Sequence, residues 1–344
     1  MRKTVKIVDE RIKTMMYYMA PLEGVTDFVY RGLFDRYFGP ADKYFIPFLT
    51  PAEGGKLSRR QKADVLWENN EGLASVPQIL TNSPEEFAAL AVRLHKWGYR
   101  EVNLNLGCPS RTVVSKGKGA GLLREREYLR EFLDRIFDKA DVEISIKTRI
   151  GAEDPEEFDM FLELYNQYPV KELIVHPRTL TEYYKGAPHL DAYIKAMKKS
   201  RHPLCYNGDL FTAEDVQRLR KKCPGVERLM FGRGLIGNPS LLSEIKGERK
   251  AGPSVYLEFQ NALVEAYREK LGKEKYVLAK MKELWTYRGM TGLLGRTGIE
   301  RIQRTRSLKE YMEEIKRSEG EEVNACDEIE KAGNYGSGHT SGDR

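Results

Sequence analysis

A chain of 344 residues can fold as one large domain with a smaller addition, or as two ordinary domains. Hydrophobic residues make up 41% and charged residues 31% of it, which is typical of a soluble globular protein and excludes a disordered chain. No apolar stretch approaches the length of a membrane span, and the basic N-terminal segment lacks the apolar core of a signal peptide. The net charge is +6 although residues 321–344 are acidic, so the positive charge is carried by the residues before them. A basic protein of this kind tends to attract polyanions.

The four cysteines are far apart in the sequence and form no C-x-x-C pair. This spacing argues against a disulfide framework or a zinc site, and it fits a reducing compartment. We therefore expect a cytoplasmic protein without a structural metal.

Short β-type runs recur along the first 246 residues, with helix-type segments between them. Helix starts are predicted at Ser83, Asp154 and Thr212, because each precedes acidic residues suited to a first helical turn. The eight runs cover 15–20, 43–48, 75–80, 101–106, 143–148, 172–177, 203–208 and 227–232. Eight strands alternating with helices predict an α/β fold of the (β/α)8 TIM-barrel type over residues 1–246. A doubly wound sheet is the main alternative, but no G-x-G-x-x-G or Walker-type loop follows a strand.

A different organisation follows the linker at 246–254. Apolar residues at three- and four-residue spacing predict amphipathic helices over 255–272, 273–290 and 297–317. We expect a small all-helical domain at 254–317. The tail at 318–344 has too little apolar content to fold, so a disordered segment is predicted there.

The carboxyl ends of the predicted strands carry polar residues and glycines, and this is the side of such a barrel on which active sites lie. Lys147 ends one strand, where burying an unpaired ammonium would be costly without a ligand. Cys108 lies between Gly107 and Pro109 at the end of another strand. Its position alone leaves two interpretations open, a catalytic thiol at the barrel mouth or a small buried packing residue.

The last two strands end in glycines, Gly208 and Gly232, and Arg233 follows the second. Loops at this place in a barrel commonly bind phosphate through backbone N–H groups, although two ordinary tight turns are the alternative. With Lys147 facing negative charge, these residues predict a phosphorylated, electron-accepting cofactor such as flavin mononucleotide (FMN).

Several motifs in order resemble those of the tRNA-dihydrouridine synthases, flavin enzymes that reduce uridine in tRNA: "MAPLEGVTDFVYR", "NLNLGCPSRTVVSKGKGAGLL", "SIKTRIG", "VHPRT", "YNGD" and "MFGRG". The resemblance covers almost the whole barrel and implies FMN, with NADPH as electron donor. It implies that the flavin ring contacts Pro21, Leu22, Glu23, Gln78 and Lys147, and that the ribityl phosphate contacts His176, Asn207, Gly208, Asp209, Gly232 and Arg233. It also implies that Asn105 contacts the target uracil and that Cys108 is the catalytic acid.

The implied reaction explains a thiol at the barrel mouth. Reduction of the uracil C5=C6 bond needs a hydride at C6, from reduced flavin N5, and a proton at C5, which a mobile thiol on the other face can supply. The glycine-rich stretch after Cys108 carries Arg111, Lys116 and Lys118 and suits a loop that closes over a phosphate-bearing substrate. A merely flexible surface loop is the alternative.

Basic residues gather with aromatic ones at 282–309, which suits RNA backbone binding. We expect Arg301, Arg304 and Arg306 to contact tRNA, because a target base that leaves its stack needs a second grip on the RNA. A solvated helix face over core aromatics is the alternative. A monomer is expected.

Two features depart from the family pattern. Pro177 follows His176 where a small residue is common, and Cys205 lies just before Asn207, where we interpret it as a packing residue. Two other functions stay open at this point: a flavin barrel acting on a free pyrimidine, as dihydroorotate dehydrogenases do, and a non-catalytic RNA-binding barrel. The basic helical segment argues against the first and the pair Cys108 and Lys147 against the second.

Overall fold

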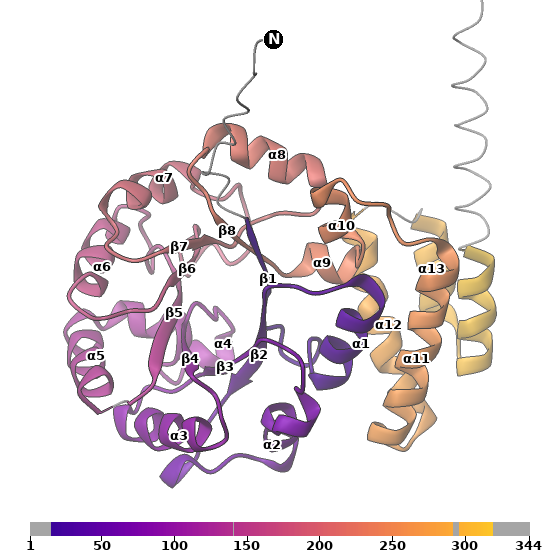
Figure 1. Cartoon of the computed structure of the whole chain (residues 1–344), viewed down its shortest axis with the longest axis horizontal. Coiled ribbons are helices and arrows are strands. Elements are labelled where there is room, and N and C mark those ends of the chain that lie inside the picture. The colour runs from indigo at the N-terminus through magenta and orange to yellow at the C-terminus, as the bar shows by residue number, and fades with distance from the viewer. Residues whose placement is uncertain (1–14, 140, 292–295, 319–344) are drawn as a thin grey trace, which may run out of the picture.

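In the computed structural model, which describes residues 15–139, 141–291 and 296–318, eight parallel strands close into a barrel in chain order (Figure 1). Closure is made by β1 pairing with β8 in parallel. The strands are β1 (Met16–Met19), β2 (Lys43–Leu49), β3 (Ser75–Ile79), β4 (Glu101–Leu106), β5 (Glu143–Arg149), β6 (Leu173–His176), β7 (Leu204–Tyr206) and β8 (Arg228–Phe231). All eight predicted strands are confirmed, with bounds within two residues of those expected.

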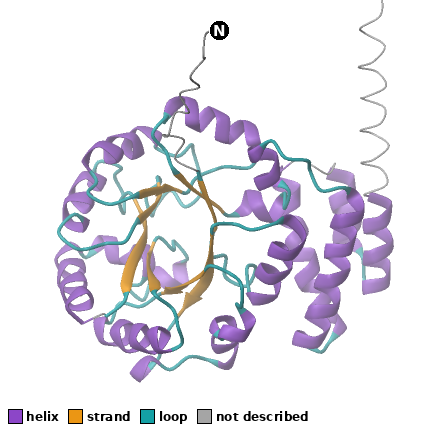
Figure 2. Cartoon of the chain, in the orientation of Figure 1, coloured by secondary structure: helices purple, strands orange, loops and turns teal. Residues whose placement is uncertain are grey.

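Helices surround the strands on the outside of the barrel (Figure 2). The helices that follow the strands are α1 (Phe28–Phe38), α2 (Arg59–Val65), α3 (Pro84–Lys96), α4 (Arg111–Val114), α5 (Arg126–Lys139), α6 (Glu157–Tyr165), α7 (Leu190–Lys199), α8 (Ala213–Lys222), α9 (Arg233–Gly237) and α10 (Leu241–Lys246). Short 3-10 segments lie at η1 (Glu53–Gly55), η2 (Trp67–Asn69) and η3 (Gly119–Arg124). The TIM-barrel prediction is therefore confirmed.

Two of the three predicted helix starts are confirmed by their caps. The side chain of Ser83 accepts from the backbone N–H of Glu86, and Thr212 forms a capping box with Asp215. At Asp154 the cap is present but the regular helix begins later, at Glu157. The Asp154 carboxylate accepts from the backbone N–H of Glu156 at 2.9 Å, and the Glu157 carboxylate accepts from the N–H groups of residues 152, 153 and 154.

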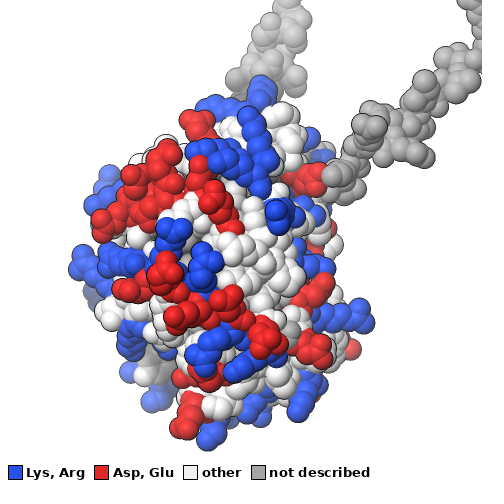
Figure 3. Space-filling view, turned by 90° about the vertical axis from the view of Figure 1, so that its left-hand side faces the viewer, with Lys and Arg blue, Asp and Glu red and all other residues white. Residues whose placement is uncertain are grey.

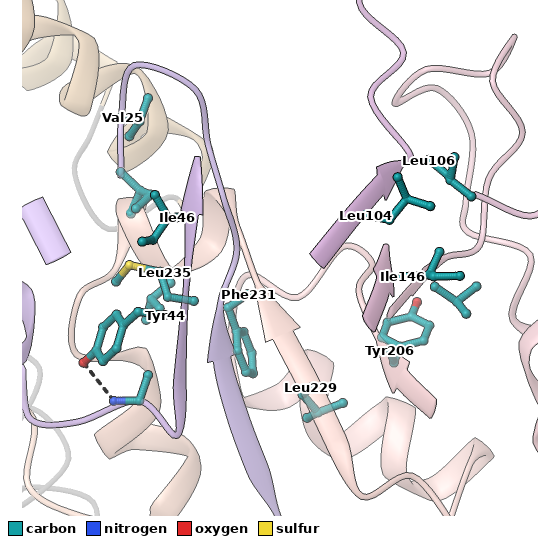
Figure 4. Packing of buried hydrophobic residues seen from close by; sticks show 14 of the residues in the cluster. Val25, Tyr44, Ile46, Leu104, Leu106, Ile146, Tyr206, Leu229, Phe231 and Leu235 are labelled. Atoms are coloured by element: carbon teal, nitrogen blue, oxygen red, sulfur yellow. Dashed lines mark hydrogen bonds between the residues drawn. The ribbon is translucent and has the colours of Figure 1, made fainter. Parts of the chain in front are cut away.

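The main hydrophobic core lies between the strands and the surrounding helices (Figure 4). Leu104 and Ile146 of neighbouring strands are fully buried there, and so is Tyr44, whose hydroxyl accepts from the backbone N–H of Ala41 at 3.0 Å. A smaller apolar cluster fills the barrel interior with Tyr18, Ala20, Phe45, Val76, Ile174, Cys205 and Met230. Cys205 is thus a packing residue, as expected.

A layer of charged side chains closes the amino-terminal end of the barrel interior. Lys43 forms ion pairs with Glu101, at 2.7 Å, and with Glu172. Glu172 also accepts from the Tyr18 hydroxyl at 3.0 Å and lies 3.8 Å from Arg228. The four charged residues belong to β2, β4, β8 and the residue before β6, so alternate strands supply one layer, as is usual in such barrels.

The C-terminal helices α11 (Pro253–Leu271), α12 (Glu274–Thr291) and α13 (Arg296–Arg304) stand beside the barrel on the side of α1 and α9 (Figure 1). Asp27, the N-cap of α1, receives hydrogen bonds from Tyr267 at 3.0 Å and Lys270 at 2.8 Å. A side chain at Gly237 would overlap the backbone of Tyr287, so α9 and α12 meet at very close range. The barrel and α11–α12 share one continuous core, while the division into domains at 246–254 stays a prediction.

The single helix predicted over 297–317 is wrong, because the chain forms α13 and then a separate helix over 308–318. Thr305 ends α13 by donating its hydroxyl to the carbonyl of Ile302 at 2.8 Å. Ser307 starts the next helix by accepting from the backbone N–H of Glu310 at 3.1 Å. Ser318, predicted to begin the disordered tail, is instead a buried residue at the end of the helix over 308–318. The predictions for residues 319–344 and for the N-terminal 14 residues lie outside the described part of the chain. Within that part, no helix combines the length and the apolar character needed to cross a membrane.

Candidate active site

A cavity of about 470 Å³ opens at the carboxyl ends of the strands, a size usual for sites that bind small molecules. Every strand or the loop that follows it contributes to its wall. All the predicted barrel residues line it together: Pro21, Leu22, Glu23, Gln78, Asn105, Cys108, Lys147, His176, Asn207, Gly208, Asp209, Gly232 and Arg233. The polar strand ends thus meet at one site.

A chain of side-chain amides crosses the floor of the cavity. Asn105 donates to Gln78 at 2.7 Å, and Gln78 donates to Asn103 at 2.7 Å. Asn103 in turn donates to the hydroxyl of Ser145 at 2.9 Å. All four side chains are buried, so the network fixes their orientation before any ligand arrives.

The same network holds the loop that carries Cys108. The side-chain oxygen of Asn105 accepts from the backbone N–H of Gly107 at 3.0 Å and of Cys108 at 2.9 Å. The thiol is half-buried in the cavity wall, and burial raises its pKa above the ordinary value. Cys108 therefore carries its proton at neutral pH, as a proton donor must.

The glycine-rich stretch after Cys108 packs against that residue. Ala120 donates its backbone N–H to the carbonyl of Cys108 at 3.1 Å, and a Cβ at Gly119 would lie 2.9 Å from the same oxygen. Gly119 has a φ of +60°, which also favours glycine. Arg111 and Lys116 lie exposed on the outer side of this segment.

Lys147 brings an ammonium group into the cavity without a counter-ion. Among the described residues its side chain makes no hydrogen bond or ion pair, and burial together with the nearby Arg149 lowers its pKa to about 8. Arg149 is fully buried and donates to the carbonyls of Gly107 at 2.9 Å and Thr179 at 2.7 Å. Its remaining Nη2 is buried without a partner in the described chain. Two cations with unfilled donor positions therefore face the same space.

His176 and Arg233 line the cavity next to these cations, and the buried Arg178 lies behind them. Nε2 of His176 lies 3.1 Å from Nη1 of Arg178, which can only donate, so the neutral ring carries its proton on Nδ1. Burial and the surrounding cations hold the pKa of His176 well below its ordinary value. Asp209 pairs with Arg178 at 2.5 Å and with Arg233 at 2.9 Å, so its carboxylate positions both guanidinium groups.

Glycines bring the loops after β7 and β8 into close contact. A Cβ at Gly234 would overlap the carbonyl of Leu210, and one at Gly208 would overlap the ring of Tyr206. These close approaches explain glycine at 208 and 234, whereas a Cβ at Gly232, directly after β8, would make only ordinary contact with Ala20 at 3.6 Å. The two loops consequently form one continuous backbone surface in the cavity wall.

Sequence reasoning missed several residues that line the cavity. Tyr184 covers Arg233, whose guanidinium carbon lies 4.6 Å from its ring centroid, and about half of its side chain is exposed. The preceding Tyr183 has a φ of +55°, a conformation that is unfavourable outside glycine. Tyr287 and Met290 come from α12, so the C-terminal helices complete the wall.

The predicted tRNA contacts on α13 lie outside this cavity. Arg301 pairs with Glu314, and Arg304, which is largely exposed, lies 3.9 Å from Glu300. Arg306 is exposed but follows the end of α13, so it does not belong to the same helix as the other two arginines. Acidic side chains are thus interspersed with the predicted RNA contacts. No group of three or more His, Cys, Asp or Glu residues that could hold a metal ion occurs among the described residues.

Comparison with known proteins identifies the family. The profile of the family described as "Dihydrouridine synthase (Dus)" matches residues 18–334. The chain is 27% identical over 282 residues to "Probable tRNA-dihydrouridine synthase 1" of Synechocystis sp., covering 80% of this chain and 74% of that protein. It is 28% identical over 256 residues to "tRNA-dihydrouridine synthase B" of Pseudomonas aeruginosa, covering 73% and 76% of the two chains. Among solved structures, morphinone reductase aligns with a TM-score of 0.47 and 13% identity over 70% of this chain and 88% of its own. From the profile match, which spans most of its length, the chain belongs to the dihydrouridine synthase family.

Proposed function

We propose that this protein reduces the C5=C6 bond of uridine in tRNA to give dihydrouridine. The observation that carries the proposal is a protonated thiol and an unpaired ammonium in one cavity at the barrel mouth. Membership of the dihydrouridine synthase family and the names of the relatives support the substrate.

The cavity suits FMN, because unfilled cationic donors lie beside two glycine-lined loops. The ring would contact Pro21, Leu22, Glu23, Gln78 and Lys147, and the phosphate would contact His176, Asn207, Gly208, Gly232 and Arg233. Asp209 would hold the arginines in place for that phosphate, because its oxygens are already paired. When bound, FMN reduced by NADPH supplies the hydride that uracil C6 receives.

Cys108 supplies the other half of the reduction. Its sulfur gives its proton to uracil C5 and then recovers a proton from solvent. Asn105 holds the backbone of Cys108 and can donate a hydrogen bond to the uracil from the same side chain. Lys147 remains close to the ring edge, where its positive charge favours the reduced, anionic form of the cofactor.

Within this proposal the C-terminal helices provide a second contact to tRNA. Arg304 and Arg306 are exposed and can reach phosphates, while Arg301 is partly covered by its pair with Glu314. Met290, about half exposed at the cavity mouth, lies where the RNA must pass.

The experiment uses the full-length protein with tRNA transcribed without modified nucleosides and with NADPH. We expect flavin absorbance in the purified protein and dihydrouridine in the recovered tRNA, detected by mass spectrometry of its nucleosides. Free uridine and orotate should not be reduced. A colourless protein that takes up no FMN, or one that reduces only the free pyrimidine, would overturn the proposal.

A further inference from the structure

The segment between β2 and β3 carries a run of basic residues at the same end of the barrel as the cavity. Lys56, Arg59, Arg60 and Lys62 are all exposed, and the one acidic residue of α2, Asp64, is buried. The exposed acidic residues of the segment lie outside this run, at Glu53, Glu68 and Glu71. Exposed cations that a core does not need are available to a partner.

This segment is fixed at the edge of the cavity. Arg60 lies 3.9 Å from Glu23, which lines the cavity beside Cys108. Gln61 donates its amide to the hydroxyl of Thr50 at 2.8 Å, which ties the first turn of α2 to the end of β2. The cations of α2 therefore stand next to the mouth.

A second group of cations extends this surface along the rim. Arg111 and Lys116 are exposed on the loop that follows Cys108. The loop is held by Asn82, whose amide donates to the carbonyl of Lys116 at 3.0 Å. The two groups thus lie on the loops after β2 and after β4, on either side of the loop after β3 that carries Asn82. We call Lys56, Arg59, Lys62, Arg111 and Lys116 the basic rim.

Two features together define the basic rim, namely its place beside the cavity and its lack of ion pairs. None of its five members forms an ion pair with any described residue. On α7, by contrast, Lys195 and Lys199 pair with Asp159 at 2.6 and 3.0 Å. Figure 3 shows this flank of the barrel, where basic and acidic side chains are interspersed over the surface. Lys198, Lys221 and Lys222, at the ends of α7 and α8, are also exposed and have no ion pair with a described residue, so its position beside the cavity is what sets the basic rim apart.

We propose that the basic rim binds the sugar–phosphate backbone of the tRNA next to the target nucleotide. This inference rests on the proposed function, because it takes tRNA as the partner. A nucleotide that enters the cavity draws its flanking phosphates over the mouth, within reach of the long side chains of α2 and of the loop after Cys108. The phosphates release their condensed counter-ions when these lysine and arginine side chains neutralise them, so the contact stabilises the complex most at low salt.

The test compares two triple variants of the full-length protein with equal changes of charge. The first is Lys56→Gln/Arg59→Gln/Lys62→Gln, which leaves Arg60 and its pair with Glu23 intact. We expect its dissociation constant for unmodified tRNA to rise about tenfold or more, and the log–log salt slope to become shallower by about 2 to 3. Fluorescence anisotropy over a series of salt concentrations measures both, and flavin content with thermal unfolding reports folding.

The control is Lys198→Gln/Lys221→Gln/Lys222→Gln, at the ends of α7 and α8 on the opposite face of the barrel. Its affinity and slope should match those of the unaltered protein. An equal loss of tRNA affinity in the two variants, or no loss in the first, would contradict the proposed role of the basic rim while leaving tRNA as the substrate. Failure of the unaltered protein to bind tRNA would instead overturn the proposed function.

Discussion

The two ends of the barrel interior both bury charge, but they do so in different ways. At the amino-terminal end, Lys43 lies between Glu101 and Glu172, and Arg228 completes the layer. At the carboxyl end, Lys147 has no partner among the described residues and Arg149 keeps an unfilled Nη2. In the first layer each charged residue has an oppositely charged partner within the chain, although Oε1 of Glu101 is buried without a hydrogen bond in the described residues. In the second layer Lys147 gains a partner only when something else binds.

The difference separates structural charge from functional charge in one fold. Burying an unpaired cation costs free energy, so its presence calls for a compensating ligand, whereas a paired layer needs none. Burial alone would not distinguish Lys43 from Lys147, but their ion-pair partners do, because Lys43 has two carboxylates beside it and Lys147 has none in the described chain.

The largest effect expected at the mouth comes from Cys108→Ala. Loss of a positioned proton donor should slow uridine reduction about 10²- to 10⁴-fold, measured by single-turnover assays on tRNA. Flavin content and oxidation of NADPH should stay near those of the unaltered protein. The matched control is Cys205→Ala, which removes a buried thiol from the barrel interior and should leave turnover unchanged. Full activity of Cys108→Ala would return this cysteine to a packing role.

At the opposite end, Lys43→Met should act on stability. Removing one partner of a buried ion pair leaves Glu101 without a cation and Glu172 with Arg228 alone, at 3.8 Å, and such a loss typically costs about 3–5 kcal/mol of unfolding free energy. Urea unfolding of the cofactor-free protein measures the loss. Because the cavity wall does not include Lys43, the folded variant should still bind flavin. A variant as stable as the unaltered protein would show that the paired layer is not needed for folding.

Lys147→Met should change the pH dependence of stability in the cofactor-free protein. The pKa of Lys147 is about 8 in the folded chain against an ordinary value of 10.5, so the unfolded chain binds more protons between these values. The stability of the folded chain should therefore rise with pH from about 8 to 10.5. Below pH 8 the buried lysine is charged, and the free-energy cost of burying it has its full value. The variant should be more stable than the unaltered protein at pH 7, and the difference should vanish near pH 10.5. Parallel profiles would indicate that Lys147 is solvated or paired.

The architecture could be predicted from sequence because its signals are local. Each strand is a short apolar run, and polar residues at the strand ends had to meet at one rim once the barrel closed. The first residue of α6 is predicted too early, because a capping pattern at Asp154 does not reveal that a turn at 155–156 precedes the regular helix.

The missed site residues are distant in sequence from the strand ends. Tyr184 lies eight positions beyond His176, and Tyr287 and Met290 reach the cavity through the close packing of α12 on α9. No motif marks them, since only the tertiary contact brings them to the mouth. The ion pairs of Arg301 and Arg304 were also hidden, because composition counts charges without showing which of them are neutralised.

The smallest effect is expected on α13, where the predicted RNA contacts lie among acidic side chains. Arg301→Gln/Arg304→Gln/Arg306→Gln removes as many charges as the basic rim variant, but the first two of these cations are already partnered by Glu314 and Glu300. The neighbouring carboxylates weaken the attraction of these cations for a phosphate, and an exposed ion pair contributes at most about 1 kcal/mol of free energy. We therefore expect the dissociation constant for tRNA to rise less than about fivefold, with a salt slope shallower by about 1. The same anisotropy titrations measure both quantities. A loss of affinity as large as that of the basic rim variant would mean that paired cations bind RNA as well as unpaired ones do. The distinction between paired and unpaired cations, which separates the two ends of the barrel interior, would then not apply to its surface.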